Sequence, residues 1–200
     1  MKNVQKSLSI LMFGVFLALG TEAQTTSRLN GSAPSATALT PAEKKLFTDV
    51  ETAAKGYVAV RERVRKQLPK LPDKATSEQI ATNKTALRQG VQMTWANAKP
   101  GDVFAPAAGV LIKNVIKAEF QGWERSELRK TVLEADTKGV PLKLNIPYPE
   151  SKELVEMSPA LLLALPQLPK ELRYRFIGRN LVILDRDNAL IVDYLKDALP

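Results

Sequence analysis

Residues 172–194 read LRYRFIGRNLVILDRDNALIVDY, and this stretch decides how the chain can fold. Apolar residues alternate with Arg173 and Arg175 at its start, which is the period-two pattern of a strand with one face in a core. Two further apolar runs follow, separated by the turn residues 178–180 and 186–188. The stretch therefore predicts three short strands in an antiparallel β-meander. Because so small a sheet is not stable alone, it must pack on other elements of the chain.

Helices are predicted upstream of this sheet, over residues 40–139. Thr40 as N-cap, Pro41 at the first helical position and Glu43 at the third begin a capping box. The first helix runs to Leu68, which precedes a proline and is therefore pushed out of the helical region. Its apolar residues recur in steps of three and four, at Leu46, Val50, Ala53, Tyr57, Val60, Val64 and Leu68.

Two more long helices are predicted after the first. The second begins at Thr76 or Ser77 and ends at residues 99–101, and the short Pro-rich connector before it predicts an antiparallel pair with the first helix. The phrase GDVFAP at residues 101–106 closes the second helix, with Asp102 capping an N–H group, and opens the third. The third helix runs to about residue 138, where a glycine and a proline end it.

Residues 140–200 are predicted as a Pro-rich connector, a short helix capped by Ser158, and the β-meander packed on the helices. The predicted fold class is therefore α+β. It comprises about three long antiparallel helices, a short helix and a small C-terminal antiparallel sheet, in a single unit.

The N-terminus has the features of a cleavable secretory signal. Lys2 and Lys6 give a basic start, and an apolar run of twelve residues follows, which is too short to span a bilayer. Small residues then lead to an expected cut after Ala23. Residues 1–23 are thus a predicted signal peptide, and residues 24–39, which are polar and aperiodic, a disordered leader. No later segment is apolar enough to span a bilayer, so the mature chain is expected in the periplasm or the medium.

The chain contains neither cysteine nor histidine. Disulfides, thiol nucleophiles, imidazole bases and the usual zinc ligands are therefore excluded. We expect no cofactor and no metal site, and catalysis would have to use carboxylates, lysine, tyrosine or a hard cation. The 177 residues after the signal carry a net charge of +7. Outside the cytoplasm this charge suits lipid head groups, cell-wall polymers or acidic proteins, rather than nucleic acid.

Two basic clusters supply the candidate binding residues, which are Arg173, Arg175 and Arg179 in the β-meander and Arg61, Arg65 and Lys66 near the end of the first helix. The first cluster is expected on an exposed face of the sheet, with Arg186 near the next turn, where guanidinium groups would bind phosphates or carboxylates. Its alternative is a charged edge strand that prevents aggregation. The alternative for the second cluster is a solvated helix end, whose cations suit the helix dipole.

The acids near the C-terminus raise the question of a cation site. Asp185, Asp187 and Asp193 supply oxygen atoms, but a calcium loop also needs a glycine at its turn and ligands at alternate positions. Here Arg186 separates two of the acids and no such glycine is present. Ordinary turn chemistry is therefore the favoured interpretation.

Three phrases together resemble a known group of proteins. They are GDVFAP at residues 101–106, YRFIGRNLVILD at 174–185, and NALIVD at 188–193 with the DALP ending. The chain resembles, over residues 40–200, an uncharacterised family of exported bacterial proteins. The resemblance implies export and one fold unit, and it transfers no activity and no site residue.

These features predict a non-enzymatic binding or scaffold protein of the bacterial cell envelope. Its partner is expected to be another envelope protein or an anionic lipid or cell-wall surface. The chain itself would be a monomer or a homodimer, since heptad-like stripes suit either state. Two alternatives stay open. One is a carboxylate- or cation-dependent hydrolase of an envelope polymer, with Glu124 and Glu127 as one candidate pair, and the other is a periplasmic chaperone-like binder with an exposed apolar concavity.

Overall fold

The computed structural model describes residues 39–121 and 126–200, which belong to one unit spanning residues 36–200. The predicted signal peptide, and the predicted leader up to residue 38, lie outside the described residues. In the described part, no helix combines the length and the apolar character that crossing a membrane requires.

Helix α1 spans Pro41–Gln67 and begins as predicted. The Thr40 hydroxyl accepts from the Glu43 N–H, and the Glu43 carboxylate accepts from the Thr40 N–H at 2.8 Å. Leu68 caps the end of the helix in an extended conformation, as its place before proline requires. The buried positions recur in steps of three and four, at Phe47, Val50, Ala54, Tyr57, Arg61 and Val64, so the predicted stripe is confirmed only in part.

Helix α2 spans Ser77–Thr94 and packs against α1. It starts where predicted, and a capping box between Thr76 and Gln79 forms there. The contact is close, since a β-carbon on Gly90 would lie 2.5 Å from a methyl carbon of Val64. The predicted end at residues 99–101 is wrong. The helix stops earlier because Trp95 caps it and packs edge-on against Tyr57 of α1, with ring centroids 5.4 Å apart.

The single long third helix predicted to residue 138 is also wrong. Helix α3 spans Pro106–Glu119 and helix α4 spans Ser126–Glu134. Helix α3 ends at Phe120, after which the chain tightens into a turn in which the Gln121 N–H donates to the Ala118 carbonyl at 3.3 Å. The buried Phe120 ring packs edge-on against Phe176 of the sheet, at 6.1 Å, which anchors this helix end.

The C-terminal elements follow the prediction closely. Helix α5 spans Pro159–Ala164 with Ser158 as its N-cap. Strands β1 (Leu172–Ile177), β2 (Asn180–Asp185) and β3 (Ile191–Leu195) form an antiparallel sheet in the order β1-β2-β3, which confirms the meander and the α+β class. The β1–β2 register pairs Leu172 with Asp185.

Both faces of the sheet are covered, which differs from the expectation of one exposed face. The face that carries Leu172, Tyr174 and Phe176 packs in one core with residues of the helices. The other face belongs to a second apolar cluster of Tyr148, Ile177, Val182, Leu184 and Ile191, packed against the Pro-rich connector. The connector is held there by main-chain hydrogen bonds to β3, because the Asn145 N–H donates to the Ile191 carbonyl at 2.8 Å.

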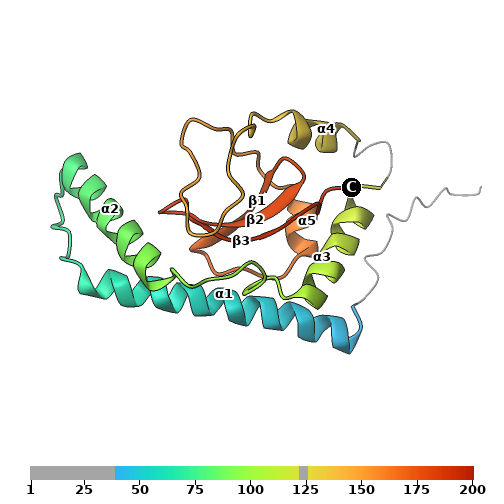
Figure 1. The fold of residues 1–200 in the computed structure, drawn as a ribbon, viewed down its shortest axis with the longest axis horizontal. Coiled ribbons are helices and arrows are strands. Elements are labelled where there is room, and N and C mark those ends of the chain that lie inside the picture. Colours follow the sequence, from blue (N-terminus) through green and yellow to red (C-terminus); the bar gives the residue numbers. More distant parts are fainter. Residues whose placement is uncertain (1–38, 122–125) are drawn as a thin grey trace, which may run out of the picture. The chain divides into compact units, whose positions relative to one another are not determined.

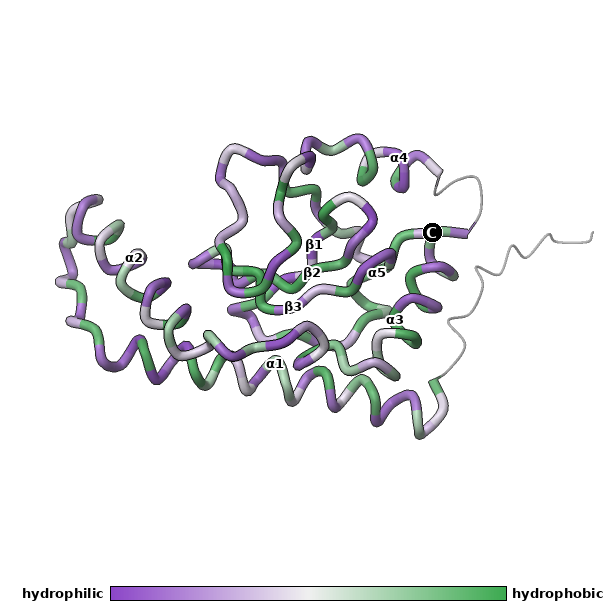
Figure 2. Tube along the Cα trace, in the orientation of Figure 1, coloured by the Kyte–Doolittle hydropathy of each residue, from purple (hydrophilic) through white to green (hydrophobic). Residues whose placement is uncertain are grey.

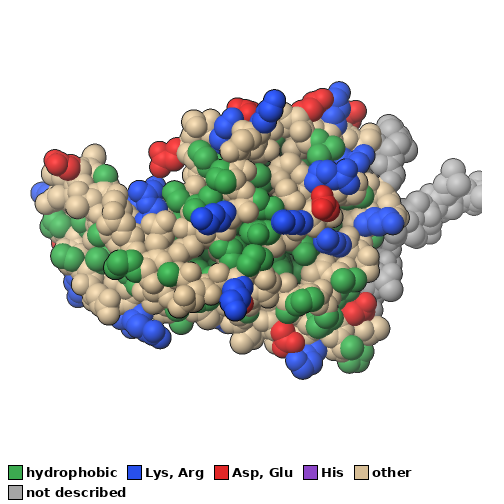
Figure 3. Space-filling view, in the orientation of Figure 1, with side chains coloured by type: hydrophobic (Ala, Val, Ile, Leu, Met, Phe, Trp, Pro, Cys, Tyr) green, Lys and Arg blue, Asp and Glu red, His purple; other side chains and the backbone are tan. Residues whose placement is uncertain are grey.

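Figure 1 shows α1 running along one side of the sheet, with α2 folded back at its C-terminal end and α3 near its N-terminal half. Figure 2 shows hydrophobic residues concentrated in the strands, whereas the outer loops of the connector are hydrophilic. In Figure 3, lysine and arginine side chains stand around an apolar area on the face shown. The candidate residues lie at the C-terminal end of α1, along β1 and in the turn between β1 and β2.

Candidate functional site

A buried polar network joins α1 to the end of β2. Arg61 is only 1 % exposed and Asp185 is fully buried, and Arg61 Nε donates to Asp185 Oδ2 at 3.1 Å. The Tyr57 hydroxyl and Asn188 Nδ2 donate to the same oxygen, at 3.0 and 3.2 Å. The N–H groups of Asp187 and Asn188 donate to Oδ1. Asp185 is therefore satisfied by the chain's own donors and fixes the turn after β2 to α1.

Asp187 pairs with the basic end of α1. Its carboxylate accepts from Arg61 and from Arg65, the latter at 3.1 Å. Glu62 pairs with both arginines as well. Arg61 thus offers no surface to a ligand, and the charge of Arg65 is already paired. Lys66 is exposed and has no ion-pair partner in the described part of the chain.

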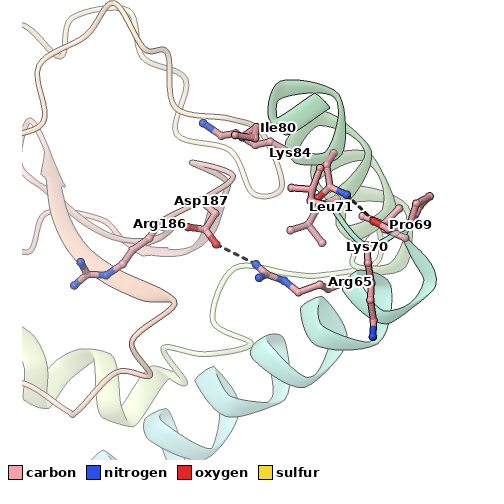
Figure 4. Close-up of a pocket in the computed structure, with 11 residues that line it drawn as sticks. Arg65, Pro69, Lys70, Leu71, Ile80, Lys84, Arg186 and Asp187 are labelled. Carbon is pink, nitrogen blue, oxygen red and sulfur yellow. Dashed lines mark hydrogen bonds and ion pairs between the residues drawn. The ribbon is translucent and has the colours of Figure 1, made fainter. Parts of the chain in front are cut away.

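A cleft of about 530 Å³ lies beside these residues, between the end of α1, the turn that follows it and α2 (Figure 4). Its walls include Leu68, Leu71 and Ile80, and the last two are 41 % and 50 % exposed. Figure 4 shows Asp187 turned toward Arg65, whereas Lys70 and Arg186 direct their charged ends away from the cleft. The cleft therefore combines apolar walls with the paired Arg65 and Asp187 and with Lys84, which lies 3.9 Å from Glu150.

A second concavity, of about 240 Å³, runs along β1, which is an edge strand of the sheet. We call it the arginine groove. Its basic residues are Lys170, Arg173, Arg175 and Arg186, and Leu162, Leu163 and residues 166–169 also line it. Arg173 and Arg175 alternate along β1 as predicted, and both are half-buried. Arg186 lies beside them because its main-chain N–H donates to the Glu171 carbonyl at 2.8 Å.

The arginines of the groove have no carboxylate partner among the described residues. No ion pair forms there with Arg173, Arg175 or Arg186. Burial lowers the pKa of Arg175, and the neighbouring Arg173 and Arg186 charges lower it further, against an opposing effect of Glu156. The Nε atoms of Arg173 and Arg175 are buried and have no hydrogen-bond partner among the residues that the structure describes. Buried donors are normally paired, so these two Nε groups are exceptions within the described residues.

Two of these arginines also protect the edge of the sheet. Arg175 Nη1 donates to the Tyr174 carbonyl at 2.8 Å, and Arg186 Nε donates to the Leu172 carbonyl at 3.1 Å. Side-chain donors on the carbonyls of an edge strand hinder its pairing with another strand. These two hydrogen bonds support the alternative that the arginines protect the edge strand from aggregation. Each bond uses only one nitrogen of its guanidinium group.

Arg179 lies apart from the groove, in the turn between β1 and β2. Its side chain is exposed, and its carbonyl accepts from the Ala198 and Leu199 N–H groups. At about 3.3 Å per residue, Arg173 lies about 13 Å from Ile177 at the end of β1, and Arg179 lies beyond that end. Of the predicted residues, the structure therefore brings Arg173 and Arg175 together with Arg186, and leaves Arg61, Arg65, Lys66 and Arg179 outside the groove.

The GDVFAP phrase forms a turn that binds a carboxylate of the chain itself. Gly101 adopts φ +94°, and Asp102 accepts from an N–H group as predicted. The N–H groups of Gly101, Val103 and Phe104 donate to the fully buried Asp193 carboxylate, at 3.1, 2.9 and 2.8 Å. The turn thus docks the α2–α3 connection on β3. In the described part of the chain, no group of three or more acidic side chains is placed to hold a metal ion.

Sequence reasoning missed Lys170 in the groove and the pairing of Asp193. The signal for Asp193 was a lone acid within the apolar run LIVDY, which indicates a buried carboxylate with its own donors. The signal for Lys170 was the hairpin register, because a residue just before β1 must lie near the residues just after β2. No protein-family model matches the chain, and comparisons with curated proteins and with solved structures also found no match.

Proposed function

We propose that this chain is an exported, non-enzymatic binding protein of the bacterial cell envelope, and that it binds an anionic partner in the arginine groove. The proposal is carried by one observation: Arg173, Arg175 and Arg186 lie together with no carboxylate partner among the described residues. Clustered like charges repel one another, and an anion in the groove would relieve this repulsion.

The chemistry of the side chains supports an oxyanion as the group that is bound. A guanidinium group presents several N–H donors in one plane, which matches the spacing of phosphate and carboxylate oxygens. The half-buried position of the Arg173 and Arg175 side chains reduces screening by water and strengthens their interaction with an anion.

The proposal is tested by the equilibrium binding of inorganic polyphosphate to two charge-matched double variants. Arg173→Gln/Arg175→Gln should weaken binding by about tenfold or more, because hydrogen bonds to charged groups contribute about 1.5–3 kcal/mol each. The control, Lys44→Gln/Lys138→Gln, removes the same charge from exposed positions outside the groove and should change binding less than about threefold. Equal losses in the two variants, or no binding by the unaltered chain, would contradict the proposal.

The hydrolase alternative stays a prediction. Glu127 is exposed on α4, and Glu124 lies outside the described residues. No pair of carboxylates among the described residues adds an observation in its favour.

A further inference from the structure

We infer that the partner of the arginine groove is a membrane surface rich in anionic phospholipid, into which Leu162 and Leu163 insert. This inference rests on the proposed function and names the class of partner. Its basis is that exposed leucines and arginines without a carboxylate partner among the described residues line the same groove.

The leucine wall is apolar and is held in place. Leu163 is 80 % exposed and Leu162 is 41 % exposed, although both belong to a helix whose Leu161 is buried in the core. The Ser158 hydroxyl caps this helix by accepting from the Leu161 N–H at 3.3 Å. The two leucines are therefore presented outward by an anchored turn, as in proteins that insert apolar side chains at the head-group boundary.

The arginine wall supplies the matching charge. Lys170, Arg173, Arg175 and Arg186 carry four positive charges beside the leucines, and no ion pair neutralises them among the described residues. Basic residues next to apolar ones favour an anionic membrane surface, because the phosphates meet the cations while the apolar side chains enter the acyl boundary.

Two other occupants fit the groove less well. A volume of about 240 Å³ is below the range of about 300–1,000 Å³ typical of sites that enclose a small molecule. An extended acidic peptide would add to the edge of β1, but the Leu172 and Tyr174 carbonyls already accept from Arg186 and Arg175. A membrane surface contacts the groove from outside, so it requires neither an enclosing volume nor free carbonyl groups on β1.

The test uses the chain from Gln24 to Pro200, which contains the whole unit 36–200 and lacks the apolar signal run. Co-sedimentation is measured with vesicles of equal parts phosphatidylglycerol and phosphatidylethanolamine, and with vesicles of phosphatidylcholine alone. Binding is expected to the first and not to the second. The same chain is titrated with inorganic polyphosphate and with a poly-glutamate peptide.

Two variants probe the two walls of the groove. Arg173→Gln/Arg175→Gln should lower vesicle partitioning about thirtyfold, since each cation near an anionic membrane contributes about 1 kcal/mol. Leu163→Ser should lower it about tenfold, because an inserted leucine side chain is lost. Met93→Ser, at a 77 % exposed position of α2 outside the groove, is the matched control and should leave partitioning unchanged.

Arginine-dependent and Leu163-dependent binding to the anionic vesicles supports the inference. Arginine-dependent binding of polyphosphate or poly-glutamate, without vesicle binding or without an effect of Leu163→Ser, overturns the lipid inference and leaves the proposed function standing. Loss of arginine dependence with every probe overturns both.

Discussion

Asp185 and Asp193 attach the C-terminal sheet to the rest of the chain. Both are fully buried, and both accept hydrogen bonds from the chain's own donors, Asp185 from α1 and its own turn and Asp193 from the GDVFAP turn. A buried charge is tolerated only when such partners surround it. These residues are structural, and the acids near the C-terminus serve the fold.

Replacing Asp193 should destabilise the fold strongly. Asp193→Ala leaves the N–H groups of Gly101, Val103 and Phe104 without their acceptor, and each unpaired buried donor costs about 1–3 kcal/mol. We expect the free energy of unfolding, measured by urea denaturation, to fall by about 3 kcal/mol or more. Asp73→Asn, at an exposed turn position, should be nearly neutral, and a small effect of Asp193→Ala would contradict this account.

Tyr57 and Tyr174 should keep their protons at pH values at which exposed tyrosines ionise. Burial raises the pKa of both hydroxyls well above the ordinary value of 10.0, and Asp185 adds to the effect on Tyr57. The unfolded chain releases these protons near pH 10 and the folded chain does not, so stability falls as the pH rises above about 10. In an absorbance titration of the chain, Tyr57 and Tyr174 should ionise only on unfolding. Ionisation of Tyr57 or Tyr174 in the folded state would contradict the prediction.

Single residues show where prediction from sequence stops. The capping residues Thr40 and Ser158 were predictable because a cap acts through its immediate neighbours. Arg61 was predicted as a surface residue, yet it occupies a core position of α1 because Asp185 and Asp187, more than 120 residues later in the chain, neutralise it. No local sequence pattern indicates a partner that lies so far along the chain.

At the scale of elements, the contact between α1 and α2 depends on a missing side chain. Gly90→Ala should improve the helix but force the new β-carbon against Val64, and overpacking costs about 1–3 kcal/mol. Gly56→Ala on α1 has open space and should instead stabilise by about 0.5–1 kcal/mol. Thermal unfolding checks both signs.

A double-mutant cycle identifies the cause of the Gly90 effect. Gly90→Ala combined with Val64→Ala should be more stable than the sum of the two single effects predicts, since the smaller side chain admits the new β-carbon. Strict additivity of the two substitutions would mean that Val64 is not the obstacle.

The elements that sequence predicted well are those specified locally. The three strands follow from alternation and turn residues, and the starts of α1, α2 and α5 follow from their caps. The break between α3 and α4 was missed, because it accompanies the packing of Phe120 on Phe176, which is a tertiary contact. The packing of the Pro-rich connector on the second face of the sheet was also missed, because it too depends on tertiary contacts, the main-chain hydrogen bonds to β3.

At the scale of the whole molecule, export is the claim on which the proposed location depends. The basic start, the short apolar run and the small residues before Gln24 predict cleavage after Ala23. Expression of the full chain in a bacterium, followed by N-terminal sequencing of the periplasmic fraction, should give a sequence starting QTTSRL. Recovery of the intact chain in the cytoplasm would contradict export.

The candidate site was only partly accessible from the sequence. Arg173 and Arg175 were predictable as neighbours from the strand alternation. Their combination with Lys170 and the leucines of α5 depends on how β1, β2 and α5 pack, and the exclusion of Arg61 depends on burial. The sequence gives the type of each residue, but only the fold decides whether its side chain is exposed and unpaired and so able to bind a partner.

The most direct test of the central claim is a magnetic-resonance titration of the arginine Nε–H signals with a soluble short-chain phosphatidylglycerol. We expect the signals of Arg173, Arg175 and Arg186 to shift together and saturate, because these side chains line the same groove and have no carboxylate partner among the described residues. The signal of Arg61, bonded to Asp185, should stay in place. Shifts confined to Arg65 and its neighbours on α1, or spread evenly over all exposed arginines, would contradict the claim that the arginine groove is the binding site.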